Sequence, residues 1–126
     1  MRSGSSSGAM SGFAACLLMA TLAAGMAQAS GATEDEAMID LAWDSGCFNC
    51  HDLDDTLRGP AWRDVAERYR DDDEALARLV VTVREGGSGN WGEERMTPNR
   101  RVAEEDIERL VSWLLSLPPA EDEDED

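Results

Sequence analysis

The chain has few of the residues that usually build metal sites. Its 126 residues include a single histidine, His51, and three cysteines. A structural zinc site needs four ligands. One of the cysteines, Cys16, lies in an N-terminal segment that we expect to be removed, so a structural zinc site is excluded. The chain also has no lysine, which leaves arginine as the source of its positive charge.

The chain also lacks an apolar run of the roughly 20 residues that comfortably span a bilayer. Its apolar stretch at residues 13–24 follows a start with one positive charge, Arg2, and precedes the small-residue ending Ala27-Gln28-Ala29. This order is typical of a secretory signal peptide. We therefore predict a signal peptide over residues 1–29 that is cleaved near Ala29/Ser30, export to the periplasm, and no stable membrane insertion.

Negative charge dominates the composition. There are 27 acidic residues against 11 arginines, and the formal net charge is −16. A net anion gains nothing from counterion release at phosphates, so nucleic acid is excluded as a partner. The charge fits either solubility, including in a salty medium, or steering toward a positively charged partner. One domain is predicted over residues 30–119, followed by a disordered acidic tail over residues 120–126.

The most informative run of residues is Cys47-Phe48-Asn49-Cys50-His51. Two thiols and an imidazole in C-x-x-C-H spacing indicate covalent attachment of a c-type haem. The two sulfurs would form thioethers to one porphyrin, and the adjacent imidazole would be the proximal axial ligand. A thioredoxin-like dithiol would need a βαβ context, whereas the flanking sequence shows helical periods only. Export agrees with haem attachment, because c-type haem is attached outside the bacterial cytoplasm.

Hydrophobic periodicity predicts an all-α domain of about four short helices. The run Thr33-Glu34-Asp35-Glu36 resembles a capping box, so the first helix should begin there and continue to about Ser45. Gly46 then ends it. The second helix should open at Pro60, because proline is favoured in a first helical turn.

The second half of the chain predicts two more helices and a loop. The third helix should follow the acidic run at residues 71–74 and end at the glycines that begin at Gly86. A loop is expected from Gly86 to Arg101, and no strand pattern is present. The last helix should span about Ala103 to Ser116. Ala103 is a weak N-cap, for which the acidic first turn compensates.

The predicted loop carries the best candidate for a second axial ligand, Met96. A thioether is a soft donor that binds iron in both oxidation states, and Pro98 restricts the chain just after it. Met38 lies at helical spacing on the first predicted helix and is assigned to the core. From the residues alone, Met96 is either an iron ligand or simply a packed or exposed side chain.

Across nearly the whole mature domain, the chain resembles a class I cytochrome c of the small bacterial type that donates electrons to periplasmic reductases and terminal oxidases. Five blocks, in the expected order, carry the resemblance: Gly46-Cys47-Phe48-Asn49-Cys50-His51, Gly59-Pro60-Ala61-Trp62-Arg63-Asp64-Val65-Ala66, Gly86-Gly87-Ser88-Gly89-Asn90-Trp91-Gly92, Met96-Thr97-Pro98-Asn99 and Leu110-Val111-Ser112-Trp113-Leu114-Leu115-Ser116. The resemblance implies the class I cytochrome c fold around one haem c, covalently attached through Cys47 and Cys50.

The resemblance also implies roles for single residues. Met96 would be the sixth ligand of the iron. The Pro60 carbonyl would accept the imidazole N–H of His51, a contact that fixes the tautomer and orientation of an axial histidine. Trp91 would lie against the haem near a propionate, with core packing as the alternative. Asn99 would sit close to the ligand sulfur.

The expected function is soluble periplasmic electron transfer on a His/Met-ligated haem c, without enzymatic activity. The expected partners are redox proteins: a donor such as a membrane quinol-oxidising complex and an acceptor such as a reductase or terminal oxidase. We expect a monomer. Two alternatives are a haem enzyme or gas sensor with a labile distal ligand, and a cytochrome subunit of a larger redox enzyme. Relatives often ring the exposed haem edge with lysine, which this chain lacks.

Overall fold

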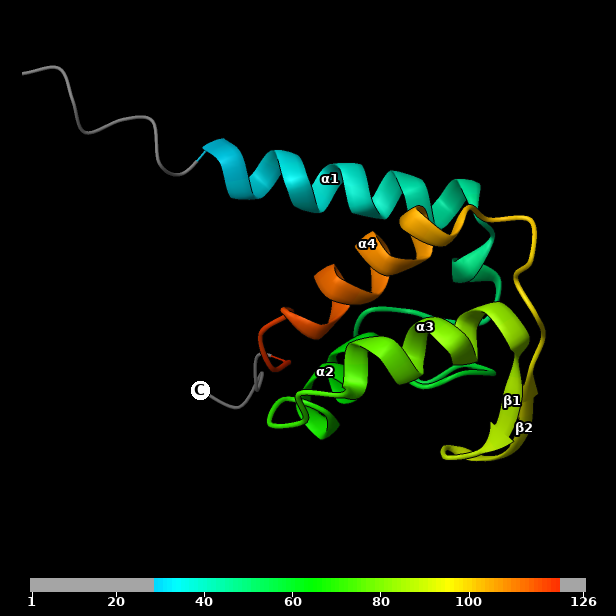
Figure 1. The fold of residues 1–126 in the computed structure, drawn as a ribbon. Coiled ribbons are helices and arrows are strands. Elements are labelled where there is room, and N and C mark those ends of the chain that lie inside the picture. Colours follow the sequence, from blue (N-terminus) through cyan, green and yellow to red (C-terminus); the bar gives the residue numbers. More distant parts are fainter. Residues whose placement is uncertain (1–28, 121–126) are drawn as a thin grey trace, which may run out of the picture.

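The structure, a computed structural model, describes residues 29–120. Residues 1–28 of the signal peptide predicted over residues 1–29 lie outside this range, as do the acidic residues 121–126. The described elements, in chain order, are α1 (Ala29–Asp44), the 3-10 helix η1 (Cys47–Asn49), α2 (Trp62–Arg68), α3 (Ala75–Glu85), β1 (Gly87–Gly89), β2 (Gly92–Met96) and α4 (Glu104–Leu115) (Figure 1). The helical fold class predicted from periodicity is confirmed, with the addition of a small hairpin.

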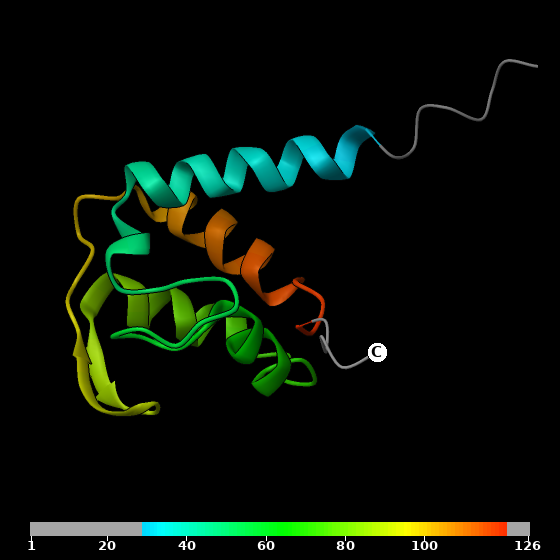
Figure 2. The same ribbon diagram turned by 180° about the vertical axis from the view of Figure 1, so that it is seen from behind.

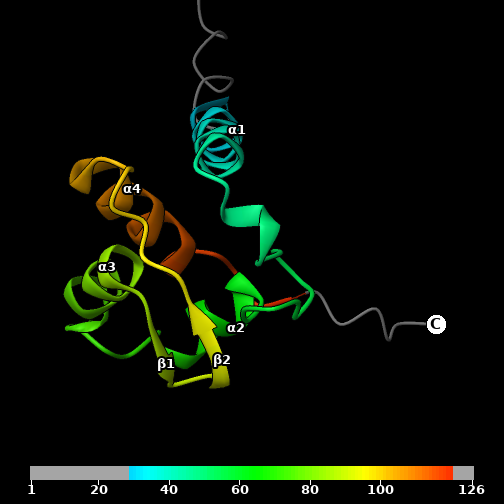
Figure 3. The ribbon, with the colours of Figure 1, turned by 90° about the vertical axis from the view of Figure 1, so that its right-hand side faces the viewer.

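The last helix, α4, is the centre of the arrangement, because it contacts α1, α2 and α3. In Figure 1, α1 lies along one side of α4 and α3 along the other; Figure 2 shows the same order from behind. The β1–β2 hairpin extends from the end of α3, away from α1. Figure 3, viewed nearly along α1, shows that η1 and the segment after it lie on the opposite side of the molecule from α3.

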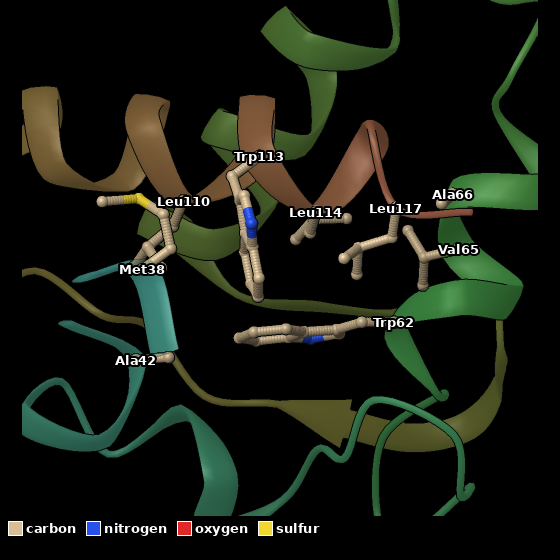
Figure 4. Packing of buried hydrophobic residues seen from close by; sticks show 9 residues of the cluster. All are labelled: Met38, Ala42, Trp62, Val65, Ala66, Leu110, Trp113, Leu114 and Leu117. Atoms are coloured by element: carbon tan, nitrogen blue, oxygen red, sulfur yellow. The ribbon is translucent and has the colours of Figure 1, made fainter. Parts of the chain in front are cut away.

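The hydrophobic core fills the space between α1, α2 and α4 (Figure 4). The indole rings of Trp62 and Trp113 meet edge to face at its centre, with 6.0 Å between their centroids, which is a favoured aromatic arrangement. The buried members of this core are Met38, Ala42, Trp62, Val65, Ala66, Leu110, Trp113, Leu114 and Leu117. The expectation that Met38 is a core residue is confirmed, since it is 4% exposed.

A hydrogen bond ties α1 to α4. The indole Nε1 of Trp113 donates to Oδ1 of Asp35 at 2.7 Å. Asp35 belongs to the run that we interpreted as a capping box, yet α1 begins at Ala29, so that run lies inside the helix and the predicted start is wrong. The residues from Ala29 to Ala32 include no proline and two alanines that favour a helix, so the single glycine among them, Gly31, does not end it.

The other helix boundaries agree within two residues. The second helix begins at Trp62, because Ala61 still has extended backbone (φ −58°, ψ 140°). The last helix, α4, matches the prediction within one residue at each end. Its N-cap residue, Ala103, makes no side-chain cap hydrogen bond, and the first turn carries three acidic residues. These carboxylates are well placed to interact with the positive end of the helix dipole.

The predicted loop from Gly86 to Arg101 is wrong over its first half, where β1 and β2 pair in antiparallel fashion. Gly87 is opposite Met96, and Gly89 is opposite Gly92. Gly89 and Gly92 both have positive φ, at 102° and 99°, a backbone region that glycine enters without steric cost. Strands built largely from glycine and charged residues lack the alternation of apolar and polar residues that identifies a strand in a sequence.

The apolar residues of α3 are buried less completely than those of α4. The apolar positions Leu79 and Val83 of α3 are only half-buried, and Ala75 is the fully buried residue of the helix. Leu79 and Val83 line a cavity, and Leu79 also packs against the core. Within residues 29–120, no helix combines the length and the apolar character needed to cross a bilayer.

Candidate haem-binding site

The two thiols of the C-x-x-C-H motif are presented by a single tight turn. Gly46, in the left-handed conformation (φ 75°), separates α1 from η1. Backbone N–H groups of Cys50 and His51 then donate to the Cys47 carbonyl at 3.2 and 3.1 Å. Cys47 and Cys50 are free, half-buried thiols. Burial raises the pKa of the Cys47 thiol above its usual value.

The imidazole of His51 is held in one orientation. Its Nδ1 lies 2.9 Å from the Pro60 carbonyl oxygen. A carbonyl can only accept, so Nδ1 carries the proton and the lone pair of the neutral ring is on Nε2. The ring also packs near the indole of Trp62, with 5.8 Å between centroids. His51 is thus prepared as a donor through Nε2.

Gly59 packs against the imidazole ring of His51, a contact that the sequence did not predict. The backbone N–H of Gly59 donates to the Cys50 carbonyl at 2.7 Å, so the chain folds back over the motif. A Cβ atom placed on Gly59 would lie 2.7 Å from Nδ1 and 2.9 Å from Nε2 of His51. Real Cβ atoms do not approach other atoms so closely, so only glycine fits here. The sequence shows a Gly-Pro turn but not the face that it covers.

Met96 ends β2 and is held close to the end of α3. Gly86 has a φ of 73°, and a Cβ atom on it would lie 2.5 Å from the Met96 carbonyl oxygen. The backbone N–H of Asn99 donates to the Val83 carbonyl at 3.0 Å. The Asn99 side-chain amide donates to the same carbonyl at 3.4 Å and to the Thr97 carbonyl at 3.3 Å. Asn99 therefore fastens the segment after Met96 to α3.

Trp91 lies in the turn between β1 and β2, 38% exposed. The Arg68 guanidinium covers its ring at 4.5 Å from the centroid and donates to the Asn90 carbonyl at 2.6 Å. Tyr69 meets Trp91 edge to face at 6.4 Å. A cation over an indole face is attracted by the ring quadrupole. The turn of the hairpin is therefore fastened to the end of α2, a role for Arg68 that sequence analysis missed.

All the predicted site residues line one cavity of about 370 Å³: Cys47, Cys50, His51, Pro60, Trp91, Met96 and Asn99. This volume is within the range of small-molecule and cofactor sites. Apolar side chains of α3 and α4 complete the wall, namely Leu79, Val83, Ile107, Leu110, Val111 and Leu114. The cavity thus combines two thiols, an imidazole and a thioether with an apolar lining. This donor set and lining fit a haem c.

Two charged side chains meet across the edge of this cavity. The Arg58 guanidinium donates to Oε1 of Glu94 through Nε at 3.1 Å and through Nη2 at 2.7 Å. Both residues line the cavity. Arg58 precedes Gly59, and Glu94 lies on β2 two residues before Met96. A contact between residues 36 positions apart has no local signal in the sequence, and this one was not predicted.

Comparison with known proteins agrees with this geometry. The family model for cytochrome c matches residues 23–118. The chain is 49% identical over 77 residues to a cytochrome c-551 from Allochromatium vinosum, which covers 61% of this chain and 82% of that protein. It is 38% identical over 98 residues to a cytochrome c-552 from Nitrosomonas europaea, covering 78% of this chain and 87% of the relative.

A solved structure is similar as well. The crystal structure of wild-type Nitrosomonas europaea cytochrome c552 superposes with a TM-score of 0.61 at 38% identity, covering 64% of this chain and 99% of that one. The chain therefore belongs to the cytochrome c family, as a small bacterial class I member. It carries one covalently bound haem c, for which Cys47 and Cys50 form the attachment motif. Its role is electron transfer and not enzymatic catalysis.

Proposed function

We propose that this protein is a periplasmic one-electron carrier with His51 and Met96 as the two axial ligands of its haem iron. The observation that carries the proposal is the single cavity lined by the imidazole, the thioether and both motif thiols. When bound, the haem supplies an iron that cycles between the ferrous and ferric states. The protein residues determine how that iron is held and how readily it is reduced.

Cys47 and Cys50 attach the porphyrin, and His51 completes the same turn. The hydrogen bond from Nδ1 of His51 to the Pro60 carbonyl orients the ring and increases the donor strength of Nε2. Gly59 prevents the ring from tilting toward the backbone, since there is no space for movement between them. The proximal ligand is therefore rigid on this side of the cavity.

Met96 is the proposed ligand on the other side. A thioether donates weakly, and an apolar environment disfavours the additional charge of ferric iron, so this ligand pair favours a positive reduction potential. Asn99 holds the segment that follows Met96 through the Val83 carbonyl. With both axial positions filled by protein side chains, no position is left for a substrate, which suits an electron carrier.

Trp91 is the proposed neighbour of a haem propionate. Its indole lines the cavity, and its N–H group is a hydrogen-bond donor that a carboxylate can use. The Arg68 guanidinium lies 4.5 Å from the centroid of the same ring and adds positive charge beside it. A propionate placed there would therefore meet the indole donor, whereas Arg68 supports the ring without lining the cavity.

The remaining features concern location and partners. We propose that residues 1–29 are a cleaved signal peptide, that residues 30–119 are the cytochrome domain, and that residues 120–126 are an acidic tail. The protein would work in the periplasm as a monomer. It would accept electrons from a donor such as a membrane quinol-oxidising complex and pass them to a reductase or terminal oxidase.

Absorption spectra of the exported, haem-loaded protein test the ligand pair. The oxidised protein should show the weak sulfur-to-ferric-iron band. Met96→His should abolish that band, keep the iron six-coordinate and lower the reduction potential by on the order of 0.1 V, because imidazole is the stronger donor. The control Met38→Leu changes a buried core methionine and should keep the band.

Two results would contradict the proposal. An unchanged potential in Met96→His would show that Met96 is not the ligand. Rapid binding of carbon monoxide to the reduced wild-type protein at neutral pH would show an open iron site, as a gas sensor or haem enzyme requires.

A further inference from the structure

Two chain segments carry the proposed axial ligands, and they come from different parts of the fold. His51 and its supporting residues Gly59 and Pro60 belong to the connection between η1 and α2. Met96 belongs to β2, in the hairpin that follows α3. No element in the described part of the chain contains both, so their separation depends on contacts between the two segments.

The ion pair between Arg58 and Glu94 spans these segments directly. It is a two-donor contact, with Nε and Nη2 of Arg58 at 3.1 and 2.7 Å from the same carboxylate oxygen. Arg58 is bonded to Gly59, which packs on the His51 ring, and Glu94 lies two residues before Met96. Both side chains line the cavity, and both are more than half exposed, at 69% and 53%.

We infer that the Arg58–Glu94 pair is a latch that holds the Met96 strand against the His51 segment and so limits displacement of Met96 by other ligands. This inference rests on the proposed His51 and Met96 ligation. Arg58 and Glu94 are positioning residues, because they act by fixing the two backbone segments that carry the donors.

The expected size of the effect follows from the exposure of the pair. Exposed ion pairs contribute modestly, because water and salt screen the attraction and two long side chains lose freedom. If Met96 can be displaced only when the hairpin moves away and the ion pair breaks, removing the ion pair should favour displacement of Met96 by about 1.4-fold to fivefold. The effect should disappear in concentrated salt.

Imidazole binding to the oxidised protein measures this displacement, because imidazole must take the place of Met96 at the iron. Arg58→Gln and Glu94→Gln should each raise the apparent association constant for imidazole by about 1.4-fold to fivefold at low ionic strength. The double variant should bind imidazole no more tightly than the single variants. The exchanged pair Arg58→Glu with Glu94→Arg should restore the wild-type value.

A matched control is available on α4. Arg109 is 59% exposed and pairs with Asp106 at 3.2 Å within the helix. Arg109→Gln and Asp106→Asn remove the same charges from the protein without touching the cavity, and they should leave imidazole binding unchanged. Wild-type protein in about 1 M salt should approach the affinity of the Arg58→Gln variant, which tests the latch without any substitution.

The outcomes separate the two proposals. If the wild-type protein shows the sulfur-to-iron band but imidazole binds equally to the Arg58, Glu94 and Arg109 variants, the latch is refuted and the ligand assignment stands. If the wild-type protein lacks the band and binds imidazole without displacing a thioether, the ligand assignment itself fails. A rise in affinity for the Arg109 variant as large as for the Arg58 variant would attribute the effect to net charge and would also refute the latch.

Discussion

Substitution of Gly59 by alanine provides the most direct test of how the protein holds its proximal histidine. The added methyl carbon would lie 2.7 Å from Nδ1 and 2.9 Å from Nε2 of His51, whereas ordinary contacts of a Cβ atom begin at 3.4 Å. Either the imidazole ring of His51 or the backbone at residue 59 must therefore move to relieve the clash. Either movement lengthens the 2.9 Å contact between Nδ1 and the Pro60 carbonyl.

The magnitude has two parts. Forcing an extra carbon into a filled site costs roughly 1–3 kcal/mol. Loss of the hydrogen bond to Pro60 adds about 0.5–1.5 kcal/mol. We therefore expect Gly59→Ala to reduce the free energy of unfolding of the haem-loaded protein by about 1.5–4.5 kcal/mol. The absorption spectrum should change as well, because the orientation of the proximal ligand changes.

Urea unfolding followed by haem absorbance measures this loss. The matched control is Gly31→Ala on α1, because Gly31 lacks a positive φ, has no atom within 4 Å of an added Cβ and does not line the cavity. At such a site alanine should be neutral or slightly stabilising, since it restricts the unfolded chain more than glycine does. Equal stability of the two variants, with an unchanged spectrum, would refute the close packing of Gly59 on the imidazole.

Two further predictions concern the framework around the site. Asp35→Ala should lower the free energy of unfolding by about 1–3 kcal/mol, because it leaves the buried indole N–H of Trp113 without its 2.7 Å acceptor; stability equal to the wild type in urea would contradict this. The Arg78 side chain holds the pKa of Asp72 below its usual value through a hydrogen bond. The ionised Asp72 carboxylate therefore stabilises the folded protein at pH values above its unfolded pKa of about 3.9. This stabilisation is lost as the pH falls through the lower pKa of the folded state. Thermal midpoints of wild-type and Asp72→Asn protein should therefore differ at neutral pH and converge in acid, and a constant difference would refute the pairing.

The sequence predicted the helices well, because their evidence is local. The apolar positions of α4 recur at helical spacing, and Ile107, Leu110, Val111 and Leu114 are all buried. The motif thiols and His51 were equally readable, since their spacing is itself the chemical requirement. The start of α1 was misplaced because a capping box marks a helix start only where the residues before it are not helical, and here the residues from Ala29 onward are helical.

The parts that sequence analysis missed depend on long-range contacts. The hairpin of β1 and β2 contains mainly glycine and charged residues, so neither alternation nor β-propensity marks it. The pairing of Arg58 with Glu94 and the cover of Trp91 by Arg68 join segments far apart in the chain. Only a fold that brings the segments together defines such contacts. The packing of Gly59 on His51 was missed for the same reason.

The half-buried face of α3 has a consequence for how the protein matures in the cell. Leu79 and Val83 are half-buried and line the cavity, although Leu79 also packs against the helical core. Until the cofactor is in place, these side chains lack the apolar surface that would cover them, and chains in that condition are susceptible to aggregation and degradation. Haem ligation and completion of the fold are therefore coupled, so the amount of protein that accumulates should follow the supply of haem more closely than the rate of synthesis.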